Sequence, residues 1–315
     1  MNVYDSVVIG AGPAGMTAAL YLCRAGVRTA LVEQLGPGGQ LLNTAEIENY
    51  PGFPKATAGW SLAETFAAHL ESHALDRFSG EVANIVRQGE NHVLQLETET
   101  IVARSVIVCS GATPRKLNLP DEARLTGRGV SYCAMCDGMF FKDQVVAMVG
   151  GGNAALEEAM YLSRLVKKLY LVHRRDSFRA DKIYQDKLLT RMDRIELVTS
   201  HVITELHGQD SLTGITVAPV GDHMSRASVD GSRRLDVTGL FVFIGMEPRK
   251  NFFPAELRTD AAGFVETDTE MRTNLSGIFA AGDIRSKMCR QVATAVGDGA
   301  TAAHAAFVYL EQREA

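Results

Sequence analysis

The chain has 315 residues, more than one hydrophobic core usually serves, so two domains are expected. Its 46% hydrophobic and 22% charged residues are typical of a globular protein and exclude a disordered chain. A net charge of -5 without a long basic run disfavours nucleic acid as a partner, because phosphate binding needs a clustered positive face. No apolar stretch approaches the roughly 20 residues of a membrane span, so no membrane association is expected.

The cysteines and the first residues indicate a cytoplasmic protein. Residues 1–10 lack the basic and then apolar pattern of a signal peptide. The five cysteines are odd in number and irregular in spacing, unlike the disulfide framework of a secreted protein. Only Cys133 and Cys136 form a close pair.

The chain opens with the pattern of a strand, a glycine turn, a helix and a second strand. Residues 3–9 are apolar, residues 16–25 favour a helix, and residues 28–33 form an apolar strand. The turn matches the dinucleotide fingerprint, whose glycines let a pyrophosphate approach a helix N-terminus. The acid that ends the second strand would bind ribose hydroxyls and disfavours a 2′-phosphate, so FAD or NAD is expected. A purely structural turn is the alternative. The predicted ligands are Gly10, Gly12, Pro13, Ala14, Gly15, Glu33 and Gln34.

The same pattern returns at residue 144. Residues 144–149 are apolar, a second glycine turn follows, residues 156–165 favour a helix, and residues 169–172 form a strand. The same distance, 23 positions, separates Gly10 from Glu33 and Gly150 from His173. Two units with one internal spacing imply two dinucleotide-binding domains of one design.

The second unit has basic residues where the first has an acid. Guanidinium groups pair well with phosphate oxygens, so this exchange favours the 2′-phosphate of NADP over a merely solvated basic loop. The predicted NADPH ligands are Gly150, Gly152, Asn153, Ala154, His173, Arg174, Arg175 and Arg179.

The rest of the chain indicates how the two units are joined. Residues 81–108 resemble an antiparallel meander, residues 110–120 a linker, and residues 245–248 a second crossing. Residues 277–281 form a strand, and residues 291–310 a closing helix. We expect an α/β protein with two Rossmann-like, three-layer domains, the NADPH domain being inserted into the FAD domain. The predicted boundaries are 1–115 and 247–315 for the FAD domain and 116–246 for the NADPH domain.

Cys133 and Cys136 are the candidate reactive groups. Two thiols three residues apart can close and reopen a disulfide without global unfolding. Half of a zinc site or a buried pair of small residues are the alternatives, but zinc needs two further ligands that no nearby residue supplies, so no metal is expected. Asp137 suits proton exchange with a thiolate, or it is a turn residue. Asp283 suits a hydrogen bond to a ribityl or ribose hydroxyl, or it caps a helix.

Motifs in a constant order along the chain resemble the low-molecular-weight thioredoxin reductase family. They are VVIGAGPAG at 7–15, GGQ at 38–40, IENYPGF at 47–53, CAMCDG at 133–138, GGGNAALEEA at 150–159, HRRDSFRA at 173–180, FVFIG at 241–245 and GIFAAGDIRSKMCRQV at 277–292. Two pairs depart from the family's usual residues: Ala134-Met135 stands for Ala-Thr and Asn153-Ala154 for Asp-Ser.

The resemblance implies a homodimer with one FAD per chain and thioredoxin, or a similar small disulfide protein, as partner. It implies that Cys136 faces the flavin, Cys133 attacks the substrate disulfide, and Asp137 is the acid/base. It places further flavin contacts at Gly39, Gln40, Asn49, Gly111, Gly282, Asp283, Arg290, Gln291 and Val292.

Electrons are therefore expected to pass from NADPH through FAD to the cysteine pair and on to thioredoxin. Because one thiol pair must serve both a flavin and a protein disulfide, the inserted domain is expected to rotate about its two linkers. Three alternatives stay open: a reductase of another thiol carrier, an FAD-dependent dithiol oxidase of the same family, and a nucleotide-sensing protein without turnover. The arginines argue against the oxidase and the cysteine pair against the sensor.

Overall fold

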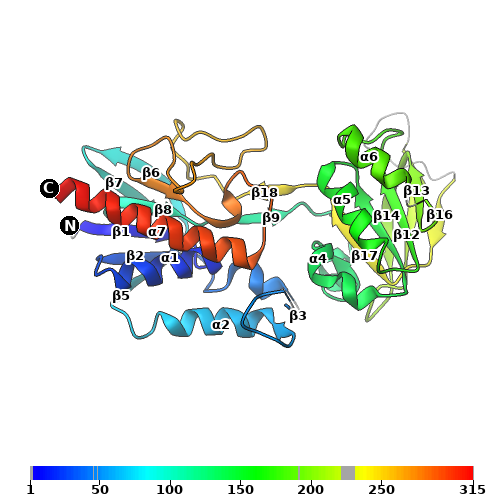
Figure 1. Cartoon of the computed structure of the whole chain (residues 1–315), viewed down its shortest axis with the longest axis horizontal. Helices are drawn as coiled ribbons and strands as arrows, with labels where there is room; N and C mark the ends of the chain where they lie inside the picture. Colours follow the sequence, from blue (N-terminus) through cyan, green and yellow to red (C-terminus); the bar gives the residue numbers. More distant parts are fainter. Residues whose placement is uncertain (1–2, 45, 48, 191, 221–230, 315) are drawn as a thin grey trace. The chain divides into compact units, whose positions relative to one another are not determined.

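The computed structural model describes residues 3–44, 46–47, 49–190, 192–220 and 231–314; Glu48, within the motif at 47–53, lies outside them. The chain divides into two compact units (Figure 1). Unit 1 comprises Met1–Thr113 and Glu247–Ala315, and unit 2 comprises Pro114–Met246. The boundaries predicted from the sequence lie after residues 115 and 246, and those of the structure lie after residues 113 and 246.

Unit 1 is built on a seven-stranded sheet in the order β5-β2-β1-β8-β7-β6, with β19 also paired to β8. The strands β1, β2, β5, β8 and β19 run parallel, whereas β6, β7 and the first half of β8 form the expected antiparallel meander. The meander therefore shares its last strand with the parallel sheet. The bounds are Val3–Ile9 (β1), Thr29–Glu33 (β2), Leu75–Ser79 (β5), Val82–Gln88 (β6), Asn91–Leu96 (β7), Thr100–Val108 (β8) and Ile278–Ala280 (β19).

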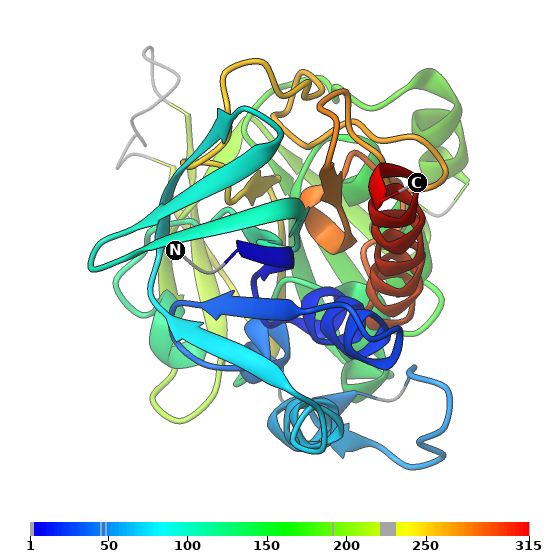
Figure 2. The ribbon, with the colours of Figure 1, turned by 90° about the vertical axis from the view of Figure 1, so that its left-hand side faces the viewer.

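Alternate side chains of β1 enter two different cores. Val8 packs in a cluster with α1 (Pro13–Arg24) and α7 (Val292–Glu314), which Figure 2 shows side by side. Val7 and Ile9 pack in a second cluster with residues of the meander and of the loop before β19. The period of two in a strand thus produces three layers from one run of apolar residues.

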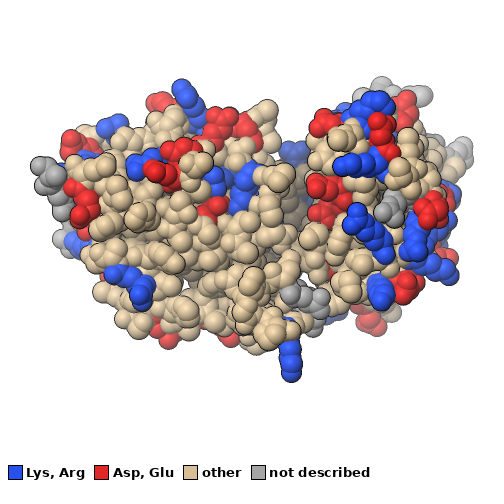
Figure 3. Space-filling model, viewed as in Figure 1, with Lys and Arg blue, Asp and Glu red and all other residues tan. Residues whose placement is uncertain are grey.

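Shorter elements of unit 1 surround these layers. A cluster that includes Leu41, Ile47 and Leu62 joins η1, β3 and α2. On the face of unit 1 that Figure 3 presents, Lys, Arg, Asp and Glu lie mainly along the upper part and the edges, and the middle is largely uncharged. The bounds are Gly39–Asn43 (η1), Glu46–Ile47 (β3), Thr57–Ala58 (β4), Gly59–His69 (α2) and Gly282–Ile284 (η3).

Unit 2 also has three layers. Its parallel sheet has the order β10-β17-β11-β12-β13, and an antiparallel sheet has the order β14-β15-β16. Val146 and Met148 of β11 pack with α5 on one face, whereas Ala147 and Val149 pack toward the antiparallel sheet on the other. The bounds are Val130–Ser131 (β10), Val145–Gly150 (β11), Lys168–His173 (β12), Ile195–Thr199 (β13), His201–His207 (β14), Gly214–Pro219 (β15), Arg233–Leu235 (β16), Gly239–Phe243 (β17), Glu122–Leu125 (α3), Ala134–Asp137 (α4), Gly138–Phe141 (η2), Asn153–Leu162 (α5) and Lys182–Leu189 (α6).

The predicted fold class, two Rossmann-like α/β units with one inserted in the other, is confirmed. The two crossing segments pair with each other as β9 (Ala112–Pro114) and β18 (Met246–Pro248). Among the described helices, none is both long and apolar enough to cross a membrane.

His92 on β7 gives the stability of unit 1 a dependence on pH. Its side chain is 2% exposed, and its Nδ1 has no hydrogen-bond partner among the described residues. Burial, together with nearby Arg87 and Arg313, lowers the pKa of His92 from 6.5 to about 4. Between these values the unfolded chain binds a proton that the folded chain does not, so the free energy of unfolding falls as the pH falls.

We expect His92→Gln to remove on the order of 2 kcal/mol of this decline, because the amide can donate one hydrogen bond without titrating in this range. The measurement is the apparent Tm from pH 7.5 to pH 4.5. The exposed His69→Gln is the matched control. An equal decline in the wild type and in His92→Gln would contradict this role.

Candidate active site

The first glycine turn brings a strand and a helix close together. Gly10 has a φ of +99°, and a Cβ there would lie 2.5 Å from the carbonyl oxygen of Cys109. A Cβ on Gly15 would lie 1.8 Å from the carbonyl oxygen of Gly10. By contrast, nothing lies within 4 Å of a Cβ on Gly12, which precedes Pro13 at the N-terminus of α1. The first and third glycines thus serve packing, and the second leaves the helix N-terminus open, as an anion site requires.

Glu33 is fixed beside this turn by backbone amides. Its Oε2 accepts the Ala11 N–H at 2.6 Å, and its Oε1 accepts the amides of Gln34 and Leu35 at 2.9 and 3.1 Å. The side chain of Gln34 donates instead to Glu81, at 3.2 Å. The carboxylate therefore stands at the end of β2, next to the glycine turn.

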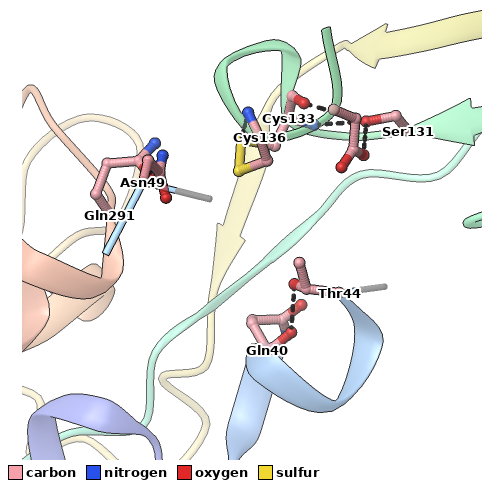
Figure 4. Close-up of a disulfide and its surroundings, with 8 residues drawn as sticks. Gln40, Thr44, Asn49, Ser131, Cys133, Cys136 and Gln291 are labelled. Carbon is pink, nitrogen blue, oxygen red and sulfur yellow. Dashed lines mark hydrogen bonds between the residues drawn. A yellow bond between two sulfur atoms is a disulfide. The ribbon is translucent and has the colours of Figure 1, made fainter. Parts of the chain in front are cut away.

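The segment from Gly38 to Gln40 also lies against the turn. Gly38 donates its N–H to the carbonyl oxygen of Ala11 at 2.8 Å. A Cβ on Gly39 would lie 3.2 Å from the Cα of Gly12, and the carbonyl oxygen of Gln40 accepts the Thr44 hydroxyl at 3.1 Å (Figure 4). The turn, Glu33 and this segment therefore lie together in unit 1.

The segment after β19 reaches the same turn. A Cβ on Gly282 would lie 2.8 Å from the Cβ of Ala14. Oδ1 of Asp283 is buried and has no hydrogen-bond partner among the described residues. Burial raises the pKa of Asp283, against the opposing effect of Lys287 and Arg290. An unpaired buried carboxylate oxygen is costly, so this one is suited to a hydroxyl group of a ligand.

Asp298, which the sequence analysis missed, holds this segment in place. Its Oδ2 accepts the Gly282 N–H at 3.1 Å and lies 2.8 Å from Nζ of Lys287. Its Oδ1 lies 2.9 Å from a guanidinium nitrogen of Arg285. The available signal was that Asp298 is the only acid in α7 before Glu311.

The remaining predicted flavin contacts lie in unit 1, and most of them are bonded to other residues of that unit. Asn49 donates to Oε1 of Gln291 at 3.1 Å, so a hydrogen bond spans 242 positions of the chain (Figure 4). Arg290 lies 4.0 Å above the ring of Phe264 and donates to the carbonyl oxygen of Asp283 at 3.3 Å. Val292 begins α7, and the carbonyl oxygen of Gly111 accepts the Arg249 N–H at 3.2 Å.

Cys133 and Cys136 form a disulfide in unit 2, with their Cα atoms 5.3 Å apart. Cys133 is the residue before α4, and its sulfur accepts the Cys136 N–H at 3.2 Å. Both residues are half-buried, whereas Met135 between them is exposed. The disulfide thus closes a single helical turn that can open locally.

Ser131 links the disulfide to Asp137, and the sequence analysis missed it. Its buried hydroxyl lies 2.5 Å from Oδ2 of Asp137 and accepts the Cys133 N–H at 3.1 Å (Figure 4). Burial raises the pKa of Asp137, and the hydrogen bond from Ser131 opposes that rise. Ser131 therefore fixes the carboxyl group of Asp137 in the turn that carries the disulfide, and burial favours its protonated form.

The side chain of His173, at the end of β12, packs against the second glycine turn. The ring is buried, stacks on Phe178 at a centroid distance of 5.2 Å, and lies 3.2 Å from the Ser177 carbonyl oxygen through Nε2. A Cβ on Gly151 would lie 2.2 Å from its Cε1. Burial lowers the pKa of His173, and the nearby arginines add to that effect. His173 is therefore a neutral spacer under the turn.

Three arginines carry the positive charge at this turn. Arg174 and Arg179 are exposed and Arg175 is half-buried. Within the part of the chain that the structure describes, none of their guanidinium groups has an acidic partner. Nearby, Gly152 precedes α5 with nothing within 4 Å of a Cβ, Ala154 is exposed, and the side chain of Asn153 is bonded to Asp181.

The other three cysteines are free thiols that differ from one another in burial. Cys109 is buried beneath the first glycine turn, Cys23 is half-buried in α1, and Cys289 is exposed. Burial raises the pKa of the Cys109 thiol far above its usual range. Among the described residues, no group of three or more His, Cys, Asp or Glu side chains could hold a metal ion.

Comparison with known proteins gives consistent matches over nearly the whole chain. Residues 4–299 match the model of the family described as pyridine nucleotide-disulphide oxidoreductase. The chain is 41% identical over 313 residues to a thioredoxin reductase of Listeria innocua, covering 99% of this chain and 95% of the relative. It is 39% identical to that of Bacillus subtilis, covering 99% and 96%. The crystal structure of thioredoxin reductase from Streptococcus pyogenes matches with a TM-score of 0.90 and 41% identity, covering 98% of this chain and 99% of that one.

Gly151→Ala tests the packing of His173 under the second turn. Its Cβ would lie 2.2 Å from Cε1 of His173, so the ring must move, and we expect a loss of about 1–3 kcal/mol in the free energy of unfolding. Gly152→Ala is the matched control, because nothing lies within 4 Å of its Cβ. The free energy of unfolding of both variants is measured in urea, with the protection of the unit 2 amides from hydrogen exchange as the probe. Equal stability of the two variants would show that the ring does not constrain the turn.

Proposed function

Because the chain belongs to the pyridine nucleotide-disulphide oxidoreductase family and, within it, to the thioredoxin reductases, we propose that it reduces the disulfide of thioredoxin with electrons from NADPH. One observation carries this proposal: the Cys133–Cys136 disulfide lies beside the half-buried carboxyl group of Asp137 in the unit that also holds the basic glycine turn. The homodimer and a cytoplasmic location belong to the same proposal. Among the described residues, five large apolar side chains of unit 1 are more than half exposed and support the homodimer: Tyr21, Leu35, Leu42, Trp60 and Met288.

The residues of unit 1 fit FAD. The open N-terminus of α1 would receive the pyrophosphate, and the Glu33 carboxylate would accept from ribose hydroxyls. The buried, unpaired Oδ1 of Asp283 would accept from a further hydroxyl of the ligand. FAD, when bound, supplies the capacity to exchange two electrons with both a nicotinamide and a disulfide.

The residues of unit 2 fit NADPH. The N-terminus of α5 is open at Gly152, and three guanidinium groups without acidic partners in the described chain stand near the end of β12. Arginine forks bind phosphate oxygens in pairs, so Arg174, Arg175 and Arg179 would bind the 2′-phosphate. The neutral ring of His173 would support the turn rather than add a charge.

The thiol chemistry follows from the helical turn at 133–137. Two electrons and two protons convert the Cys133–Cys136 disulfide to two thiols. Cys133, as thiolate, then attacks one sulfur of the thioredoxin disulfide, forming a mixed disulfide and releasing one thioredoxin thiolate. Cys136 attacks the sulfur of Cys133, which releases reduced thioredoxin and restores the disulfide. Asp137 takes up and returns a proton as the thiolates form and leave. The rotation of the inserted domain stays a prediction.

The proposal is tested by mixing the protein anaerobically with NADPH and oxidised thioredoxin while flavin absorbance and thiol release are followed together. We expect rapid bleaching of the flavin and thiol release in the wild type. Cys133→Ser should keep the bleaching and lower thioredoxin reduction by at least about a thousandfold, because the attacking sulfur is absent. Bleaching without thiol release in the wild type would point to another disulfide carrier, and no bleaching would exclude NADPH as donor.

Ser131→Ala tests the role of Ser131 as a positioning residue. The change removes the donor that stabilises the Asp137 carboxylate, so the pKa of Asp137 should rise further. The limb of the pH–rate profile that needs the carboxylate should then move to higher pH, with kcat at the optimum lowered several-fold. The profile is measured between pH 5.5 and 9 with thioredoxin as substrate, and Ser131→Thr, which keeps a hydroxyl, is the control. Superimposable profiles for the wild type and Ser131→Ala would rule this role out.

A further inference from the structure

The segment 174–181, here called the basic loop, carries the three arginines and is bonded directly to the second glycine turn. The amides of Arg179 and Ala180 both donate to the carbonyl oxygen of Gly151, at 2.8 and 3.2 Å. At the other end of the loop, the carbonyl oxygen of Arg175 accepts the Ser200 N–H at 3.0 Å. The loop is thus held at both ends, once by the turn itself.

Asn153 and Asp181 add a reciprocal pair of bonds to this attachment. Nδ2 of Asn153 donates to Oδ2 of Asp181 at 2.9 Å, and the Asp181 N–H donates to Oδ1 of Asn153 at 2.8 Å. Asn153 is the first residue of α5, and Asp181 immediately precedes α6. The pair therefore joins the starts of two helices across the turn and the basic loop.

Asp181 precedes α6 but does not cap this helix with its side chain. An Asp that precedes a helix usually accepts an amide of the first helical turn with its carboxylate. Here the side chain makes no such bond to α6, and its carboxylate turns to Asn153 instead. Each end of the Asn153 amide makes one of these bonds, so the pair fixes the orientation of the side chain and leaves one N–H of Nδ2 available to a ligand.

We propose that the Asn153–Asp181 pair sets the distance between the site for the nucleotide pyrophosphate and the site for its 2′-phosphate, and so contributes to selectivity for NADPH over NADH. This inference rests on the proposed function. A 2′-phosphate gains most from guanidinium groups that are already placed, because less freedom is then lost on binding. NADH lacks that phosphate, so movement of the basic loop should weaken the binding of NADPH and leave NADH almost unchanged.

The test compares two probes on the full chain by calorimetry: adenosine 2′,5′-bisphosphate and 5′-AMP. Their affinity ratio isolates the contribution of the 2′-phosphate from any effect at the 5′-phosphate. Asn153→Asp sets two carboxylates against each other, and we expect it to lower the ratio about three- to tenfold. The double variant Asn153→Asp with Asp181→Asn exchanges the two groups at constant net charge of the pair, and we expect it to restore the ratio.

Steady-state kinetics supply a second readout. Asn153→Asp should raise KM for NADPH by a larger factor than it raises KM for NADH, and the ratio of the two factors should match the change in the affinity ratio of the probes. Asn84→Asp on β6, an exposed position in unit 1, is the control for the added charge.

Three results would overturn the inference or its premise. An unchanged affinity ratio in Asn153→Asp would show that the pair does not place the basic loop. A lowered ratio that the double variant fails to restore would assign the effect to charge rather than to geometry. If the wild type itself binds the two probes equally, the proposed NADPH site is wrong, and the inference fails with it.

Discussion

The close approach of strand and helix at the two glycine turns is the constraint on which both nucleotide units depend. At the first turn, a Cβ on Gly15 would lie 1.8 Å from the carbonyl oxygen of Gly10, so no other residue lets α1 pack there. The same approach exposes the helix N-terminus at Gly12, where unsatisfied amides favour an anion. Packing and ligand binding therefore require the same backbone geometry.

The charged groups beside each glycine turn determine whether a nucleotide with a 2′-phosphate would bind there. At the first, the Glu33 carboxylate is held by three backbone amides and would repel a 2′-phosphate. At the second, the equivalent position holds a buried neutral imidazole, and the charge is carried by the arginines that follow it. One supersecondary design thus has an acid at the end of its second strand in unit 1 and three arginines after that strand in unit 2, which is the difference in charge that the proposed FAD and NADPH sites require.

Three half-buried carboxyl groups differ in how far their oxygens are satisfied by hydrogen bonds and ion pairs. Asp283 presents an oxygen that has no partner in the described chain, and Asp137 has its single partner in Ser131. Asp298, by contrast, is fully compensated by two cations and an amide, which suits a group that holds a segment rather than one that reacts. The degree to which each carboxylate is satisfied therefore agrees with the roles proposed for Asp137 and Asp283 and with the structural role of Asp298.

Sequence patterns were enough to predict the two repeated units, the path of the chain through them, and the residues that carry the thiol, acidic and basic groups. These features are local: apolar periodicity, glycine spacing and the separation of Cys133 from Cys136 are all read within about thirty residues. The roles of single side chains were decided by contacts that cross the chain. Asn153 is bonded to a residue 28 positions away, and Asn49 to one 242 positions away. Burial lowers the pKa of His173, because only the packed turn excludes water from its ring, and the role of His173 as an NADPH ligand stays a prediction.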